Sequence, residues 1–162
     1  MKLLPVLAIL AAFGIAGCSD EPPVAETNTP AAQPGGGPAP NTIEYFNQVV
    51  GDRVFFATNE HSLDGQARGT LDRQARWLEA NPGTNLTIEG HADERGTRQY
   101  NLALGARRSN SVRRYLIGQG VDANRMRAVT FGKERPVALC SDASCWSQNR
   151  RGVSIVAGSP SS

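Results

Sequence analysis

Two residues of opposite charge, Asp93 and Arg108, are the first candidates for either a salt bridge or a ligand site. Arg108 lies on a helical stripe with a four-residue interval, whose other members are Leu104, Val112 and Leu116. Because desolvation of a guanidinium costs several kcal/mol, either the Arg108 side chain extends out of the stripe to water or a carboxylate meets it there. We expect Asp93, in the preceding turn, to be that carboxylate and to form an ion pair with Arg108. The residues alone favour a plain structural salt bridge over a ligand site, since most such pairs are structural.

Metal binding and nucleophilic catalysis find little support. His61, His91 and Asp93 are possible ligands, but a zinc centre needs at least three converging ligands, and His91 and Asp93 lie two residues apart at a strand end. We expect His91 to be a hydrogen-bonded residue that shapes the turn. Serine and cysteine residues do not occur in a recognisable nucleophile context. The sequence therefore predicts a protein that is not an enzyme and has no metal or cofactor.

The amino-terminal residues are typical of an exported chain. Lys2 is followed by an apolar run and by small residues directly before Cys18, as in a secretory signal peptide at residues 1–17. The placement of Cys18 resembles a bacterial lipobox, which implies that this cysteine carries the lipid anchor; the alternative is an ordinary signal peptide with an incidental cysteine. Residues 18–41 are rich in proline, glycine and alanine, so we expect a disordered linker between the anchor and a domain at 42–157, with a flexible tail at 158–162.

Cys140 and Cys145 are expected to form a disulfide. Disulfides persist in compartments outside the cytoplasm, and the export signal sends the chain there. A zinc site is the weaker interpretation, because neither a second cysteine pair nor a nearby histidine accompanies them.

The hydrophobic periodicity predicts strands that alternate with two helices and then two closing strands. A short amphipathic helical turn is expected over 42–50. Strands are expected over 53–56, 86–89, 126–131 and 152–156, and a loop over 132–148. Ser62 is expected to cap a helix that ends at Ala80 before Asn81, and a longer helix should end near Gly118. The order β-α-β-α-β-β indicates a two-layer α/β (α+β) sandwich with a mixed four-stranded sheet.

The central stretch resembles a known family. The resemblance is carried by the run from Glu89 to Thr97 and by further motifs in the same order, namely Tyr100-Asn101, Leu104-Gly105, Arg107-Arg108, Tyr115-Leu116, Gly120-Val121, Phe131 to Pro136 and Asn149-Arg150-Arg151. These motifs closely resemble the OmpA-like domain family over residues 54–156, and in particular its peptidoglycan-binding lipoproteins.

The resemblance implies a site and a role. At the matching positions, Asp93 and Arg108 would hold the ammonium and the carboxylate of the diaminopimelate residue in the peptidoglycan stem peptide. Residues that would assist them are Asn101, Leu104, Thr97, Phe56 and Ala57; for Thr97 the alternative is that it caps the start of the long helix. Family members commonly have aspartates where this chain has Ala57 and Asn59, so backbone groups are expected to act there. The contribution of Asn149-Arg150-Arg151 stays open between ligand contact and a basic patch.

The resemblance also implies partners and a location: TolB and the Tol complex, and lipid anchorage in the outer membrane with the domain in the periplasm. The formal net charge is +2; without Lys2, Asp20, Glu21 and Glu26 it is +4 for residues 42–162, and such a mildly basic domain suits an anionic polymer, but charge alone does not choose between cell wall and nucleic acid. We expect Arg107, Arg113 and Arg114 to form a solvated face, and an exported lipoprotein would rarely meet nucleic acid. The alternatives are a wall-anchoring lipoprotein that works without TolB and, less favoured, an enzyme acting on peptidoglycan.

Overall fold

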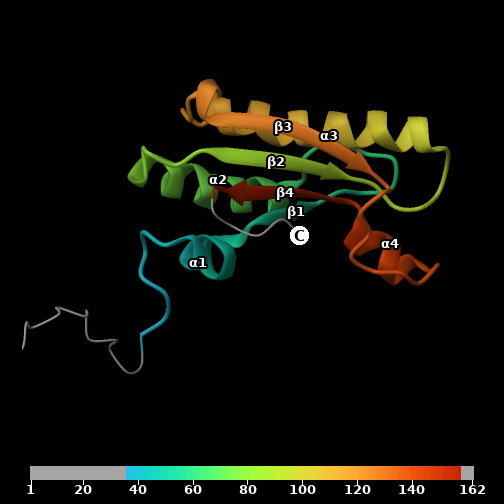
Figure 1. Ribbon diagram of the computed structural model, residues 1–162, viewed down its shortest axis with the longest axis horizontal. Helices are drawn as coiled ribbons and strands as arrows, with labels where there is room; N and C mark the ends of the chain where they lie inside the picture. Colours follow the sequence, from blue (N-terminus) through green and yellow to red (C-terminus); the bar gives the residue numbers. More distant parts are fainter. Residues whose placement is uncertain (1–35, 158–162) are drawn as a thin grey trace, which may run out of the picture. The chain divides into compact units, whose positions relative to one another are not determined.

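The computed structural model describes residues 36–157, and these residues form a sheet with helices packed on it (Figure 1). The sheet has the strand order β1-β4-β2-β3, with β1 at Arg53–Phe55, β2 at Leu86–His91, β3 at Met126–Gly132 and β4 at Arg151–Val156. β2 and β3 are parallel, whereas β4 is antiparallel to both β1 and β2. The predicted mixed four-stranded sheet is confirmed. The predictions for residues 1–35 and 158–162, including the signal peptide and Cys18, lie outside the described residues.

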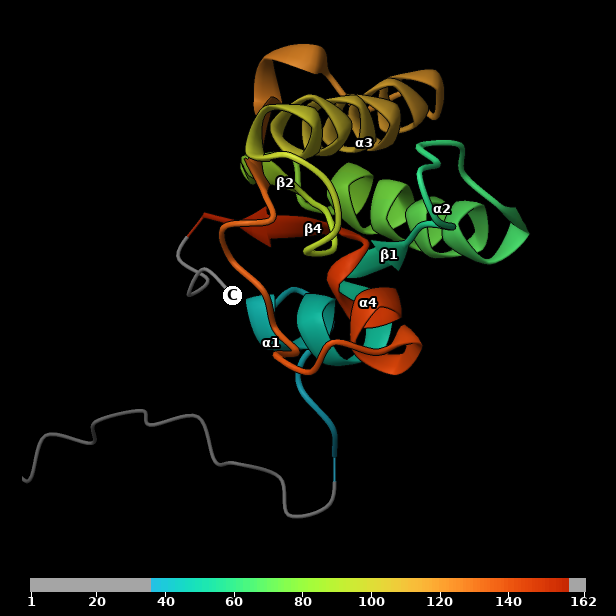
Figure 2. The ribbon, with the colours of Figure 1, turned by 90° about the vertical axis from the view of Figure 1, so that its right-hand side faces the viewer.

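Two long helices cover one face of the sheet. α2 spans Gly65–Ala80 and packs against β1, while α3 spans Arg98–Gly118 and packs against β2, β3 and β4. Figure 2 shows α3 above the sheet and α4, which spans Ala143–Asn149, below it. The core between helices and sheet contains fully buried side chains such as Leu71, Leu78, Ile88 and Leu116. None of the described helices is long and apolar enough to span a membrane.

The chain enters this fold through a short helical segment. Thr42 caps α1 (Ile43–Tyr45), which continues directly into a π-helical segment, η1 (Phe46–Gly51). Phe46 is fully buried against the ring of Trp77 in α2, with ring centroids 4.8 Å apart. The predicted amphipathic turn over 42–50 is confirmed, and its burial ties the start of the domain to α2.

Three local predictions need correction. The cap of α2 is Asp64, whose carboxylate accepts from the Ala67 N–H at 2.8 Å, not Ser62. The segment predicted as a loop over 132–148 contains α4, a seven-residue helix that is too short to show a clear apolar period. Arg113 is not part of a solvated face, because it is half-buried and donates to the carbonyls of Met126 and Ala123, the latter in the short 3₁₀ helix η2 (Ala123–Arg125).

Candidate functional site

The candidate site lies where β2 ends and α3 begins. Gly96 takes a positive φ of 86° in the connecting turn, and the Thr97 hydroxyl then accepts from the Tyr100 N–H at 3.2 Å to start α3. Further along, α3 presses directly on β2, since a Cβ added at Gly105 would lie 2.6 Å from the carbonyl oxygen of Gly90. The two glycines therefore allow α3 to approach β2 closely enough for Arg108 to reach the end of the strand.

Arg108 is fully buried and does not extend out to water, but its partners are not carboxylates. Its guanidinium donates to three backbone carbonyls: Nε to Glu60 at 2.8 Å, Nη1 to His91 at 2.8 Å and Nη2 to Ala57 at 3.1 Å. The Arg108 Cζ atom also lies 5.1 Å from the ring centroid of Phe56. The predicted ion pair with Asp93 is therefore wrong: the loop after β1 (residues 56–64) supplies two of the acceptors, and the end of β2 supplies the third.

The electrostatics of Arg108 reflect this arrangement. Burial lowers the pKa of Arg108 to about 10, and the neighbouring Arg150 acts in the same direction, whereas the Asp93 charge opposes the shift. Arg108 is still cationic at neutral pH. The fold thus holds a positive charge away from water with carbonyl dipoles as its direct partners. Burying a charge without an opposite charge bonded to it costs free energy, which argues for a role beyond structure.

Asp93 is paired with two other arginines. Arg95, two residues further along the turn, donates from Nη2 at 2.7 Å and from Nε at 3.1 Å, and Arg150 donates from Nη1 at 3.4 Å. Burial by itself would raise the pKa of Asp93, but the hydrogen bonds from Arg95 and Arg150 outweigh it and hold the pKa below its usual value. Asp93 is therefore an ionised carboxylate close to, but not bonded to, Arg108.

The structure gathers most of the predicted site residues around these two charges. The Phe56 carbonyl accepts from Arg150 Nε at 2.9 Å, and the Ala57 carbonyl accepts from Arg108, so backbone groups of the loop after β1 do take part. Asn101 is buried and donates to the Arg95 carbonyl at 2.8 Å, which braces the turn. Leu104 is buried one helical turn before Arg108. Thr97 acts as the helix cap.

The roles of three residues of the site were not predicted from the sequence. Arg95 and Trp146 had no assigned role, and Arg150 was left open. Arg150 links Phe56 to Asp93, and the Arg95 guanidinium lies 4.2 Å from the centroid of the Trp146 ring. Arg95 could have been found from its place beside Asp93 in the turn, but the contact with Trp146 depends on how α4 folds back.

A second group of charged side chains lies on the other face of β2. His91 Nε2 is 3.2 Å from Glu89 Oε2, and Glu89 is 3.9 Å from the Arg135 guanidinium. Burial lowers the pKa of His91 to about 3, helped by the nearby Arg151 and Arg135 charges, so the imidazole is neutral at physiological pH. The prediction that His91 is hydrogen-bonded is confirmed, but the partner of its ring is Glu89 in the same strand, and the contact that His91 makes with Arg108 is through its backbone carbonyl.

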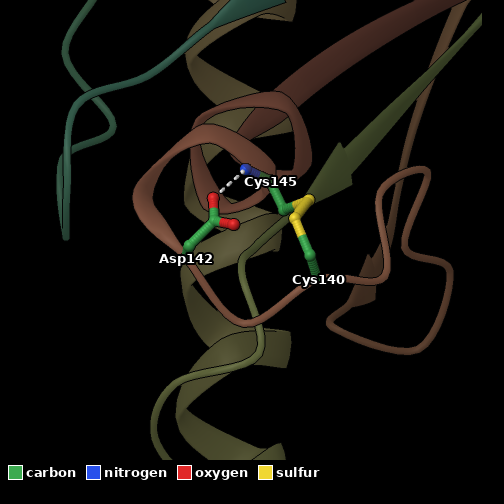
Figure 3. A group of neighbouring side chains, drawn as sticks. All are labelled: Cys140, Asp142 and Cys145. Carbon is green, nitrogen blue, oxygen red and sulfur yellow. Dashed lines mark hydrogen bonds between the residues drawn. A yellow bond between two sulfur atoms is a disulfide. The ribbon is translucent and has the colours of Figure 1, made fainter.

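The predicted disulfide between Cys140 and Cys145 is present, with the two Cα atoms 5.6 Å apart (Figure 3). Among the described residues, the one group with a suitable set of metal-binding atoms consists of these cysteines and Asp142. The sulfur atoms are bonded to each other, and the Asp142 carboxylate accepts from the N–H groups of Ser144 and Cys145 at the start of α4. This group therefore serves to close and cap α4.

Comparison with known proteins agrees with this architecture. The model of the OmpA family matches residues 55–150. The chain is 47% identical over 156 residues to the peptidoglycan-associated lipoprotein of Rhizobium meliloti, covering 96% of this chain and 89% of the relative. It is 37% identical to that of Haemophilus influenzae, covering 94% and 95%.

Solved structures give the same result. The crystal structure of the peptidoglycan-associated lipoprotein from Burkholderia pseudomallei is 42% identical, with a TM-score of 0.64 over 65% of this chain and 89% of that chain. The C-terminal domain of Helicobacter pylori MotB shares the fold alone, at 18% identity and a TM-score of 0.61 over 68% of this chain and 86% of that chain. The fold is that of an OmpA-type α/β domain. The chain belongs to the OmpA family and, within it, to the peptidoglycan-associated lipoproteins.

Proposed function

We propose that the chain is an outer-membrane lipoprotein that binds peptidoglycan noncovalently through the diaminopimelate stem peptide. In this role it tethers the outer membrane to the cell wall and, together with TolB and the Tol complex, supports constriction of the envelope at division. The observation that carries the proposal is the Arg108 guanidinium, which is fully buried and has no carboxylate bonded to it among the described residues.

A ligand carboxylate would complete the environment of Arg108. The guanidinium has five N–H donors, and the described contacts use three, one on each nitrogen. A carboxylate that accepts the remaining N–H groups would form a strong charge-assisted bond in a site shielded from water. Asp93, ionised and nearby, would accept from an ammonium. Diaminopimelate carries an ammonium and a carboxylate on one distal carbon, so a single ligand group satisfies both residues.

The envelope part of the proposal rests on the relatives. They are named peptidoglycan-associated lipoproteins. A lipoprotein needs a residue that carries the lipid, and the lipobox-like placement of Cys18 supports that role for this cysteine. Acylation at Cys18 with more than one chain would hold the protein firmly in the membrane, because one acyl chain alone binds only marginally. The roles of TolB and of division rest on the resemblance to the same group.

Sedimentation with purified peptidoglycan sacculi tests the binding. The full chain in mild detergent would be compared with Asp93→Ala and Arg108→Ala, and with Arg107→Ala as a matched loss of one exposed arginine; circular dichroism would establish that each variant is folded. We expect the wild type and Arg107→Ala to pellet with the sacculi, and both site variants to stay in solution. Equal pelleting of all four proteins would show diffuse charge attraction and would refute the site.

Two further measurements separate the alternatives. Capture of purified TolB by the immobilised chain is expected; failure of capture with intact wall binding would leave a wall anchor that works without TolB. Muropeptide profiles of sacculi incubated with the chain are expected to stay unchanged. New cleavage products that disappear with Asp93→Ala would instead indicate an enzyme.

A further inference from the structure

The carboxylate of Asp93 has no free acceptor position in this structure. Oδ1 accepts from the backbone N–H and from Nε of Arg95, both at 3.1 Å. Oδ2 accepts from Arg95 Nη2 at 2.7 Å and from Arg150 Nη1 at 3.4 Å. A carboxylate offers about four lone-pair sites, so these four donors fill it. A ligand ammonium can therefore reach Asp93 only by displacing one of the two guanidinium groups.

Arg95 is the group that can leave. Its side chain is 41% exposed, and within the described part of the chain the acceptor of its guanidinium is Asp93. The side chain of Arg150 is only 14% exposed, and it is held from the other side by its bond to the Phe56 carbonyl. Displacing Arg150 would leave a buried carbonyl without a donor, whereas displacing Arg95 would leave a guanidinium that water can reach.

A displaced Arg95 would stay beside the site because Trp146 holds it there. The Arg95 guanidinium stacks 4.2 Å from the Trp146 ring centroid, and Trp146 Nε1 donates to Glu94 Oε1 at 3.1 Å, which ties the ring to the same turn. Trp146 lies on α4, whose start is fixed by the Asp142 cap and by the Cys140–Cys145 disulfide (Figure 3).

We propose that Arg95 is a specificity-determining residue of the ligand site and that Trp146 is its positioning residue. The ligand ammonium replaces Arg95 on Asp93, and the released guanidinium, still stacked on Trp146, pairs with the ligand carboxylate that Arg108 also attracts. A carboxylate has enough acceptor sites for two guanidinium groups. This inference rests on the proposed function, because it takes Asp93 as the acceptor of the ligand ammonium.

The exchange selects for a zwitterionic group. A ligand with an ammonium and a carboxylate on one carbon gives Asp93 a new cation and Arg95 a new anion. A ligand with an ammonium alone displaces Arg95 without offering it a partner. The ion pair between Arg95 and Asp93 is then replaced by one between the ligand and Asp93, with no additional pair formed. The site should therefore prefer diaminopimelate-type stems to lysine-type stems, which differ at this position by one carboxylate.

Calorimetric titration with two synthetic ligands tests the inference. The ligands are N-acetylmuramoyl tripeptides ending in meso-diaminopimelate or in lysine, and the full-length proteins are the wild type, Arg95→Ala, and Arg98→Ala as a control that removes another exposed arginine of the same region. With Arg95→Ala we expect affinity for the diaminopimelate ligand to fall about fivefold, the range of a partly exposed charge pair. Affinity for the lysine ligand should rise, because the competitor for Asp93 is gone.

Trp146 has its own readouts. Trp146→Ala is expected to lower affinity for the diaminopimelate ligand about threefold, and Trp146→Phe, which keeps a ring for stacking, should restore most of it. The part of the tryptophan emission that Trp146→Phe removes should change when the diaminopimelate ligand binds. A purely structural tryptophan would show no such ligand-dependent signal.

The outcomes separate this inference from the proposed function. If Arg95→Ala weakens both ligands by the same factor, or neither, while Arg108→Ala still abolishes binding to sacculi, then Arg95 does not set specificity and the proposed function stands. If the wild type binds neither the tripeptides nor the sacculi, the proposed function fails, and this inference fails with it.

Discussion

Gly105 of α3 lies directly against Gly90 of β2, so closely that a Cβ on Gly105 would come within 2.6 Å of the Gly90 carbonyl oxygen. This contact sets the distance between the helix that carries Arg108 and the strand that leads to Asp93. A side chain at either position would push α3 away from β2, and the Arg108 guanidinium would then lose its reach to the His91 carbonyl.

Gly105→Ala is therefore expected to destabilise the domain by about 3 kcal/mol, the upper end of the typical cost of overpacking, because the added Cβ meets backbone that cannot easily move. Urea unfolding followed by circular dichroism measures it. Gly69→Ala is the matched control, since Gly69 lies inside α2 and a Cβ there meets nothing within 4 Å. Gly69→Ala should stabilise by about 0.5–1 kcal/mol, because alanine favours the helix. Equal effects of the two substitutions would contradict the close contact.

Arg108→Ala should cost about 2–4 kcal/mol of unfolding free energy, apart from any effect on binding. The substitution leaves the carbonyls of Ala57, Glu60 and His91 without a donor, and each lost bond in a shielded site contributes about 1 kcal/mol. Arg107→Ala, which removes an exposed neighbour, should stay within about 0.5 kcal/mol of the wild type. The comparison uses urea unfolding at neutral pH. A loss no larger than that of Arg107→Ala would mean that the loop after β1 does not depend on Arg108.

Acid should weaken the fold through His91. The folded pKa of His91 is lowered to about 3 from the ordinary 6.5, so the unfolded chain binds the proton more readily. The stability from neutral His91 is therefore complete above pH 6.5 and is lost progressively as the pH falls toward 3, at up to about 1.4 kcal/mol per pH unit. Glu89 acts in the opposite sense, because burial raises its pKa and the folded state then takes up a proton more readily.

Unfolding free energies of the wild type and His91→Gln between pH 7 and 5 isolate the histidine. The difference between the two proteins should shrink as the pH falls, since glutamine does not titrate. A difference that stays constant over this range would show that His91 is not held neutral by burial.

The sequence predicted those features of the fold that depend on local periodicity and on turn chemistry. The four-residue stripe left two alternatives for Arg108, of which burial is observed, and Asn81 and Thr97 lie at the expected helix ends. The predicted partner of Arg108 was wrong, because residue types do not reveal where backbone carbonyls point. Every loop has carbonyls, and only the path of the loop after β1 decides that Ala57 and Glu60 direct theirs at the guanidinium.

The partners of Asp93 were missed for two different reasons. Arg95 lies in the same turn, and its side chain was assigned no role although it was the nearest cation. Arg150 is 57 residues away in sequence, and it reaches Asp93 because β4 pairs with β2 in an antiparallel register that brings the two segments together. The register of distant strands is a tertiary property, so this contact was not accessible from local patterns.

The disulfide should stabilise α4 more than the rest of the domain. It closes a loop with a sequence separation of 5, and the chain-entropy estimate for so short a loop is about 2 kcal/mol. In Cys140→Ser/Cys145→Ser we expect amide exchange to become much faster over residues 137–149, while α3 changes only as far as global stability falls. Asp142→Ala, which removes the cap but keeps the disulfide, should give a smaller effect of about 1 kcal/mol. Hydrogen exchange read by mass spectrometry distinguishes the cases. Uniformly faster exchange across the domain would show that α4 unfolds only together with the core, and that the disulfide has no separate role in holding Trp146 beside Arg95.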